Sequence, residues 1–224
     1  AKAGISSRLI AMARSMVGHL RGGMGIACVI SACFFAAISG SAPATVAALG
    51  LIVIPAMMDT GYTRADSSAL MSVSGCIGLI IPPSILFVVF GSITGVSITK
   101  MFIAGIIPGL LMGAFLILTS IIKNRNTPFK LLPKATAREQ WETFKDAIWG
   151  IMMPVIILGG IYGGIFTPTE AAIVATVYGL FVALFIYRSL TWQILYEVLV
   201  DSTKQPAMVM FMPAAAVLLA VVIT

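Results

Sequence analysis

Charged side chains are scarce in this sequence. Only 10% of its 224 residues are Asp, Glu, Lys or Arg, whereas 59% are hydrophobic. A soluble domain carries about 25% charged residues, so the composition excludes an ordinary soluble domain. Short segments of alternating polarity, which are typical of a membrane β-barrel, are absent too. The sequence therefore predicts an all-α polytopic membrane protein.

Histidine and cysteine are also rare, with one His and three Cys. Cys28, Cys33 and Cys76 lie in apolar runs and form no CxxC or Cys/His motif, so neither a disulfide framework nor a zinc site is indicated. An intramembrane serine protease needs a His near its Ser, and no apolar run contains His. An aspartyl protease needs two carboxylates at membrane depth, and no run contains Asp. We therefore expect neither an enzyme nor a cofactor.

The net charge of +6 does not indicate nucleic-acid binding. In a membrane protein, basic loops more often mark the cytoplasmic face. We therefore expect the chain to lie in a lipid bilayer and to bind no nucleic acid.

The region 24–58 is uncharged and is broken in its middle by Ser39-Gly40-Ser41-Ala42-Pro43. One membrane crossing needs about 20 apolar residues and two crossings with a turn need about 40 or more. The stretch is too long for one span and too short for two full ones. It predicts a re-entrant hairpin of two half-length helices, whose tip is shielded from lipid because unpaired backbone groups are costly there.

The remaining segments follow from hydropathy, charge and helix breakers. We expect a surface amphipathic helix over 1–23, the hairpin over 24–58, a broken transmembrane helix over 67–99, a transmembrane helix over 101–122, a cytoplasmic amphipathic connector over 123–146, two transmembrane helices over 147–187, a surface amphipathic helix over 188–205 and the start of a further, truncated span over 206–224. With a re-entrant hairpin, every Lys and Arg except Lys100 falls on one face. The positive-inside rule makes that face cytoplasmic.

Two breaks can hold ligands: the hairpin tip at Ser39–Pro43 and the Gly78–Ser84 segment with its Pro82-Pro83 pair. Two consecutive prolines remove two backbone donors, so the helix must open there. Freed carbonyls can hold Na⁺, half-helix N-termini can face an anion, and the hydroxyls of Ser39, Ser41, Thr45 and Ser84 can complete either site.

At these residues the chain resembles the large membrane subunit of a TRAP (tripartite ATP-independent periplasmic) transporter, a DctM-like permease. Six segments carry the resemblance in the family's order: GISSRLI (4–10), GHLRGGM (18–24), ISGSAPATVAALG (38–50), IPAMMDTGY (54–62), GLIIPPSI (78–85) and GIFTPTEAAIVA (164–175). The family's opening helices and its second hairpin are absent. We therefore expect an internal fragment whose missing parts would precede Ala1 and follow Thr224.

The resemblance implies an elevator-type transporter with inverted repeats, of which this chain holds a part. It implies Na⁺-coupled symport of an organic acid, such as a C4-dicarboxylate or a sialic acid, across the bacterial inner membrane. The implied partners are a small TRAP membrane subunit and a periplasmic substrate-binding protein. Two alternatives stay open: a related Na⁺-coupled carrier that works without a binding protein, and a membrane scaffold without transport.

Site residues also follow from the resemblance. It implies a Na⁺ site at Ser39, Gly40, Ser41, Thr45, Gly78 and Pro82, and part of a substrate site at Ser41, Pro43, Pro83 and Ser84. No cationic side chain lies in a predicted span. We therefore expect Na⁺ to be needed before the site attracts an anion.

Overall fold

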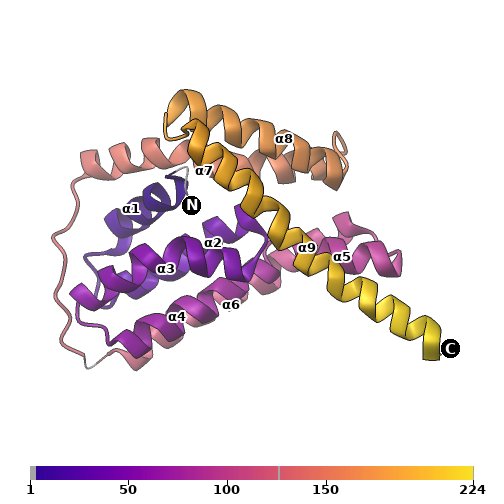
Figure 1. Ribbon diagram of the computed structural model, residues 1–224. Helices are drawn as coiled ribbons and strands as arrows, with labels where there is room; N and C mark the ends of the chain where they lie inside the picture. Colours follow the sequence, from indigo (N-terminus) through magenta and orange to yellow (C-terminus); the bar gives the residue numbers. More distant parts are fainter. Residues whose placement is uncertain (1–3, 126, 224) are drawn as a thin grey trace.

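A computed structural model describes residues 4–125 and 127–223, and within them it contains helices and no strand (Figure 1). The elements in chain order are α1 (Ile5–Val17), α2 (Gly23–Ser39), α3 (Ala42–Asp59), α4 (Arg64–Cys76), the short helix η1 (Ile77–Leu79), α5 (Ile85–Thr94), α6 (Ile98–Lys123), α7 (Ala137–Tyr162), α8 (Pro168–Phe181), the π-helical turn η2 (Val182–Ile186) and α9 (Trp192–Ile223). Among the described residues, four helical stretches are long and apolar enough to cross a membrane: Ala42–Asp59, Ile98–Lys123, Ala137–Tyr162 and Pro168–Ile186. The prediction of an all-α protein with several candidate spans is confirmed.

The helices α2 and α3 form a hairpin with a very short turn. Gly40 ends α2 in the left-handed conformation (φ 61°), and its N–H donates to the carbonyl of Ala36. Ser41 begins α3 as its N-cap, and Pro43 lies in the first turn, where a missing N–H costs nothing. The arms contain 17 and 18 residues, so the expectation of half-length helices is wrong. The second arm continues through Pro55, so this proline does not shorten it.

The segment after the hairpin is interrupted in its middle. It consists of α4, η1, an irregular stretch containing Pro82-Pro83, and α5. The helix begins at Arg64, three residues before the predicted 67–99, because Thr63 caps it by accepting from the N–H of Asp66. α6 then runs back as one 26-residue helix.

The predicted boundary between the connector 123–146 and the spans of 147–187 is wrong. Residues 137–146 belong to α7, which is continuous to Tyr162. A capping box of Thr136 and Glu139 starts the helix at Ala137, and the helix continues through Pro154.

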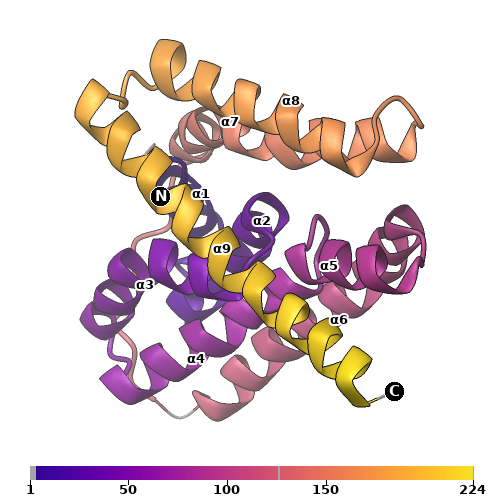
Figure 2. The ribbon, with the colours of Figure 1, turned by 45° about the vertical axis from the view of Figure 1, so that its right-hand side comes forward.

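The separation of 188–205 from 206–224 is also wrong, because α9 is continuous from Trp192 to Ile223. Its sequence contains Pro206, yet a single proline removes only one backbone donor and can be accommodated within a helix of a membrane protein. In both ribbon views α9 runs obliquely to α7 and α8 (Figures 1 and 2).

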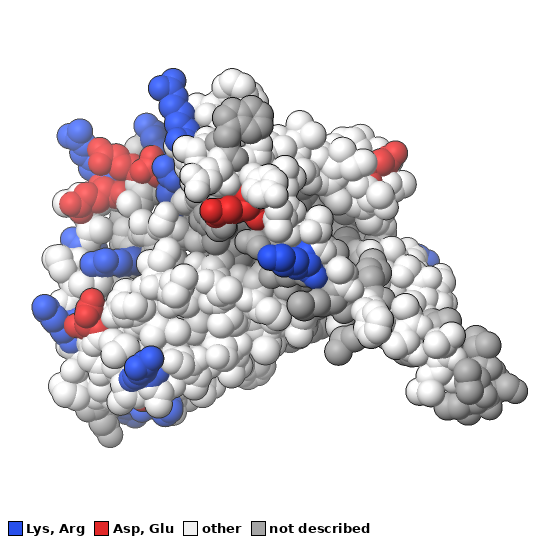
Figure 3. All heavy atoms as spheres, in the orientation of Figure 1, with Lys and Arg blue, Asp and Glu red and all other residues white. Residues whose placement is uncertain are grey.

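The helices form two groups that meet through apolar contacts and through hydrogen bonds of Ser15 in α1 with Thr143 and Gln140 in α7. The hairpin packs against α1, α4 and α6, and α7 and α8 lie as a pair along one side (Figure 2). The predicted surface helix 1–23 is only partly such a helix, because α1 buries Leu9, Met12 and Ala13 against the protein. Charged side chains gather mainly towards one end of the molecule, at the left of Figure 3, and the opposite end is largely uncharged.

Candidate functional site

The tip of the hairpin touches the break between η1 and α5. The N–H of Ile85 donates to the carbonyl of Gly40 at 3.1 Å. A Cβ on Gly40 would lie 2.5 Å from the carbonyl oxygen of Pro83, and the positive φ of Gly40 also disfavours a side chain. Glycine is therefore required at this contact, which joins the two segments for which the resemblance implies a shared Na⁺ site.

Neutral oxygens cluster just inside this contact. Ser39 Oγ and Thr45 Oγ1 are 2.9 Å apart, and Thr45 Oγ1 donates to the carbonyl of Ser41 at 2.8 Å. The absence of a side chain on Gly78 leaves room beside them, since a Cβ there would meet Ser41 O and Thr45 Oγ1 at 3.2 Å each. Thr45 is fully buried. Four of the six residues predicted for the Na⁺ site are thus adjacent.

This cluster suits a hard cation in its chemistry. Each hydroxyl oxygen has two lone pairs, so it can donate one hydrogen bond and still accept or ligate. No group of three His, Cys, Asp or Glu that could hold a metal occurs among the described residues. Carbonyl and hydroxyl oxygens are the ligands expected for an alkali cation in a membrane site.

One carbonyl at the break has a hydrogen-bond partner within the break itself. Ser84 is almost fully buried, and its hydroxyl donates to the carbonyl of Leu79 at 2.7 Å, which satisfies one acceptor freed by the prolines. Pro82 is fully buried and fills the space behind the break. Ser84 precedes α5 in an extended conformation and makes no side-chain cap. The N-terminus of α5 therefore keeps N–H groups that no side chain caps.

A cavity of about 370 Å³ lies between the tip, the break and the α7–α8 pair. Ser39, Gly40, Pro83 and Ser84 line it, whereas Ser41, Pro43, Thr45, Gly78 and Pro82 do not. Ser41 caps α3 by accepting from the N–H of Ala44, and Pro43 is exposed. Of the four predicted substrate residues, the structure thus places only Pro83 and Ser84 on the cavity.

The far wall of the cavity was not predicted. It consists of α7 and α8 residues together with Phe102 of α6, namely Phe102, Met153, Ile157, Ile161, Pro168, Ala172, Ala175 and Thr176. Met153, Ile157 and Ile161 recur every four residues and so share one face of α7. That spacing was visible in the sequence, but the whole segment is apolar, so the pattern did not distinguish this face from the others.

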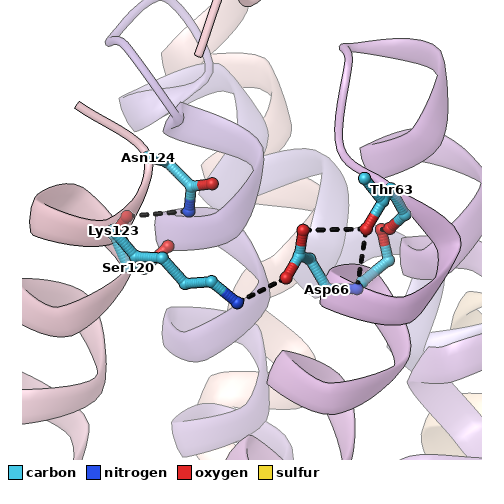
Figure 4. A network of polar contacts seen from close by, with 6 residues as sticks. Thr63, Asp66, Ser120, Lys123 and Asn124 are labelled. Atoms are coloured by element: carbon cyan, nitrogen blue, oxygen red, sulfur yellow. Dashed lines mark hydrogen bonds and ion pairs between the residues drawn. The ribbon is translucent and has the colours of Figure 1, made fainter. Parts of the chain in front are cut away.

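The base of the hairpin, at the opposite end from the tip, contains ordinary charged and aromatic contacts. Lys123 at the end of α6 pairs with Asp66 at the start of α4, and Asp66 also accepts from Thr63 Oγ1 at 2.7 Å (Figure 4). The hydrogen bond from Lys123, supported by that from Thr63, lowers the pKa of the Asp66 carboxyl. Asn124 Nδ2 donates to the carbonyl of Ser120 beside this pair (Figure 4).

Tyr62 completes the base. Its hydroxyl donates to the carbonyl of Gly22 at 2.9 Å, and its ring lies 4.6 Å from that of Phe129. These contacts join the start of α2, the loop after α3 and the segment after α6. The base is therefore held from three sides.

Comparison with known proteins adds a family to this geometry. Residues 1–224 match the family model described as "Tripartite ATP-independent periplasmic transporter, DctM component". The chain is 47% identical over 99% of its length to the C4-dicarboxylate TRAP transporter large permease protein DctM of Pseudomonas aeruginosa, covering 52% of that protein. It is 42% identical over 99% of its length to the 2,3-diketo-L-gulonate TRAP transporter large permease protein YiaN of Escherichia coli, covering 52%.

A third relative is the sialic acid TRAP transporter large permease protein SiaM of Vibrio cholerae, 39% identical over 94% of the chain and covered to 49%. The chain thus spans about half the length of these curated relatives. Each of the three is named as a permease and not as an enzyme.

Proposed function

The chain belongs to the DctM family of tripartite ATP-independent periplasmic transporters, and from this membership we propose that it forms the Na⁺-binding half of a large permease subunit that imports an organic acid. The observation that carries the proposal is the contact of the hairpin tip with the helix break, which brings partly buried neutral oxygens together.

Na⁺ would bind where Ser39, Ser41 and Thr45 bring their oxygens together. The Thr45 hydroxyl and the Ser41 carbonyl are already 2.8 Å apart, so only small rotations are needed for both to face one ion. A bound Na⁺ would link Ser39 at the end of α2 to Ser41 and Thr45 at the start of α3. Because Gly78 lies against the same oxygens, the ion would also draw the tip towards the break.

The position of the tip along α6 supports a re-entrant hairpin. Gly105 and Gly109 of α6 lie against Ile80 and Ile81 of the break, and Gly113 lies against Cys33 of α2. At a rise of 1.5 Å per residue, Gly105 and Gly109 are about 8–14 Å from Lys100 and about 21–27 Å from Lys123 along the helix. If α6 spans the bilayer, the tip therefore lies within it.

The substrate would occupy the cavity beside the tip. None of the described residues that line the cavity is charged, so an anion would rely on the hydroxyls of Ser39 and Ser84, the uncapped N-terminus of α5 and the charge of Na⁺. This arrangement makes substrate binding depend on Na⁺. The named substrates of the relatives, C4-dicarboxylate, 2,3-diketo-L-gulonate and sialic acid, are organic acids.

An elevator motion would move the hairpin and the break against α7 and α8. The contact of α5 and α6 with α7 and α8 is apolar and includes Phe102, Ile157, Ile161 and Ala171. Such a contact has no directional bonds that must break when it slides, whereas the hydrogen bonds of Ser15 in α1 with Thr143 and Gln140 in α7 would have to break or move with α1. We further propose that the complete subunit lies in the bacterial inner membrane, pairs with a small membrane subunit and receives substrate from a periplasmic binding protein.

Uptake into proteoliposomes tests the proposal. The complete permease would be reconstituted with its small subunit and binding protein, and labelled C4-dicarboxylate, diketogulonate and sialic acid would be offered with an inward Na⁺ or an inward K⁺ gradient. We expect uptake of one acid that requires both Na⁺ and the binding protein. Uptake that is equal in K⁺ would overturn Na⁺ coupling, and uptake without the binding protein would favour an independent carrier.

A further inference from the structure

Two adjoining cavities lie beneath the segment that connects α6 to α7. We call residues 127–136 of this segment the strap; it contains no helix, and it is fastened to the hairpin base by a hydrogen bond from Lys130 N to Thr60 O at 3.0 Å. The larger cavity measures about 650 Å³ and the smaller about 210 Å³. Both are lined by Arg14 of α1 and Leu132 of the strap, so they form one continuous groove.

Three cations line this groove: Arg14, Lys130 and Lys134. In the described part of the chain, none of the three forms an ion pair with a carboxylate. Two acidic residues also line the groove. These are Asp59 and Glu139, and Glu139 also accepts the N–H of Thr136 at 2.7 Å in the capping box of α7. The groove therefore carries excess positive charge.

Apolar side chains also line the groove. They belong to Ile10 and Ala11 of α1, Ile52 of α3 and Leu132. Beside Ile52, the side chain of Leu51 is 84% exposed on a helix long enough to span the membrane. A ligand that fits this groove has an anionic group for the cations and a hydrocarbon part for these apolar side chains and the exposed face of α3.

We infer that the groove binds an anionic phospholipid, with its phosphate among Arg14, Lys130 and Lys134 and its acyl chains along α3. The groove lies at the hairpin base, at the end of the molecule where charged side chains gather (Figure 3). A bound phosphate would neutralise cations that the protein leaves unpaired. It would also join α1 to the strap, and so hold the end of the hairpin that is not proposed to bind Na⁺.

Native mass spectrometry of the complete permease with its small subunit tests this inference. The complex would be equilibrated with equal amounts of phosphatidylglycerol and phosphatidylcholine, and bound lipids would be counted by mass. A groove variant would carry Arg14→Gln, Lys130→Gln and Lys134→Gln. A matched control would carry Arg64→Gln, Arg125→Gln and Lys145→Gln, which removes the same charge from exposed sites outside the groove.

We expect a preference for phosphatidylglycerol in the wild type and the control, and its loss in the groove variant, by about fivefold for each cation removed. A charge-preserving variant, Arg14→Lys with Lys130→Arg and Lys134→Arg, should retain the preference and so guards against a folding defect. Equal losses in groove variant and control would overturn the inference. So would competition by millimolar inorganic phosphate, which would indicate a free-anion site, or cross-linking of the small subunit into the groove.

Discussion

The two ends of the hairpin are held by different chemistry. At the base, an ion pair, a tyrosine hydrogen bond and an aromatic contact join α2, α4, α6 and the strap. At the tip, one backbone hydrogen bond joins Gly40 to Ile85, and the nearby hydroxyls bond to one another and to carbonyls. Side-chain contacts from several elements fix the base, whereas the tip keeps oxygens that can be redirected to a ligand. The hairpin is thus anchored by side-chain contacts at its base and not at its tip.

The largest effect is expected from Gly40→Ala. A left-handed backbone costs a side-chain-bearing residue about 1–2 kcal/mol, and the added Cβ would also meet the carbonyl of Pro83. We expect tip and break to separate and Na⁺-driven uptake to fall about 100-fold or more, because 1 Å of misplacement at a site can cost that much.

Gly95→Ala is the matched control for this change. Gly95 has a similar φ of 73°, but a Cβ there meets nothing within 4 Å. Gly95→Ala should therefore lower the midpoint of thermal unfolding through the cost of its left-handed backbone, while uptake stays close to that of the wild type. Equal uptake losses in the two variants would show that backbone strain, and not the tip contact, decides the outcome.

Thr45→Val should weaken Na⁺ activation about tenfold, measured as the Na⁺ concentration for half-maximal uptake. Valine keeps the shape of threonine but removes the Oγ1 that lies near Ser39 and Ser41, and a polar contact to a charged group contributes about 1.5–3 kcal/mol. Thr60→Val alters a buried threonine at the other end of α3. If Thr60→Val shifted Na⁺ activation as much, the ion would not be bound at the tip.

Tyr62→Phe should lower stability without changing Na⁺ activation. It removes the hydrogen bond to Gly22 but keeps the ring on Phe129, so we expect a loss of about 1 kcal/mol, seen as a lower midpoint of thermal unfolding in detergent. Tyr196→Phe, at an exposed side chain, should leave the midpoint unchanged. A change in Na⁺ activation by Tyr62→Phe would contradict the separation of base from tip.

The smallest effect is expected from Asp66→Asn. The contribution of its exposed ion pair is below about 1 kcal/mol and is screened by salt. Because the folded protein lowers the pKa of Asp66, the stabilisation is present above the ordinary pKa of a carboxyl, about 4, and disappears as the pH falls below it. Wild type and variant should therefore differ in unfolding midpoint at pH 7, and the difference should shrink as the pH falls below about 4. A constant difference would contradict an electrostatic origin.

Local rules predicted much of the fold. The Ser39–Pro43 turn and the Pro82-Pro83 break follow from backbone sterics, and Thr167 with Glu170 forms a capping box at the start of α8. The boundaries predicted at 146/147 and at 205/206 are wrong. The composition changes at both positions, but the helix continues through them. A change in polarity was mistaken there for a change in structure.

The sequence by itself determined a helical membrane protein with two breaks, because the scarcity of charge and the fixed backbone of proline and glycine act locally. Tertiary structure alone decided that Ser39 and Ser84 share a cavity while Pro43 is exposed. It also decided that α7 and α8 supply the far wall of the cavity and that the strap unites Arg14 with Lys130 and Lys134. Those juxtapositions depend on packing between helices far apart in the chain, and no local rule specifies which apolar faces will meet.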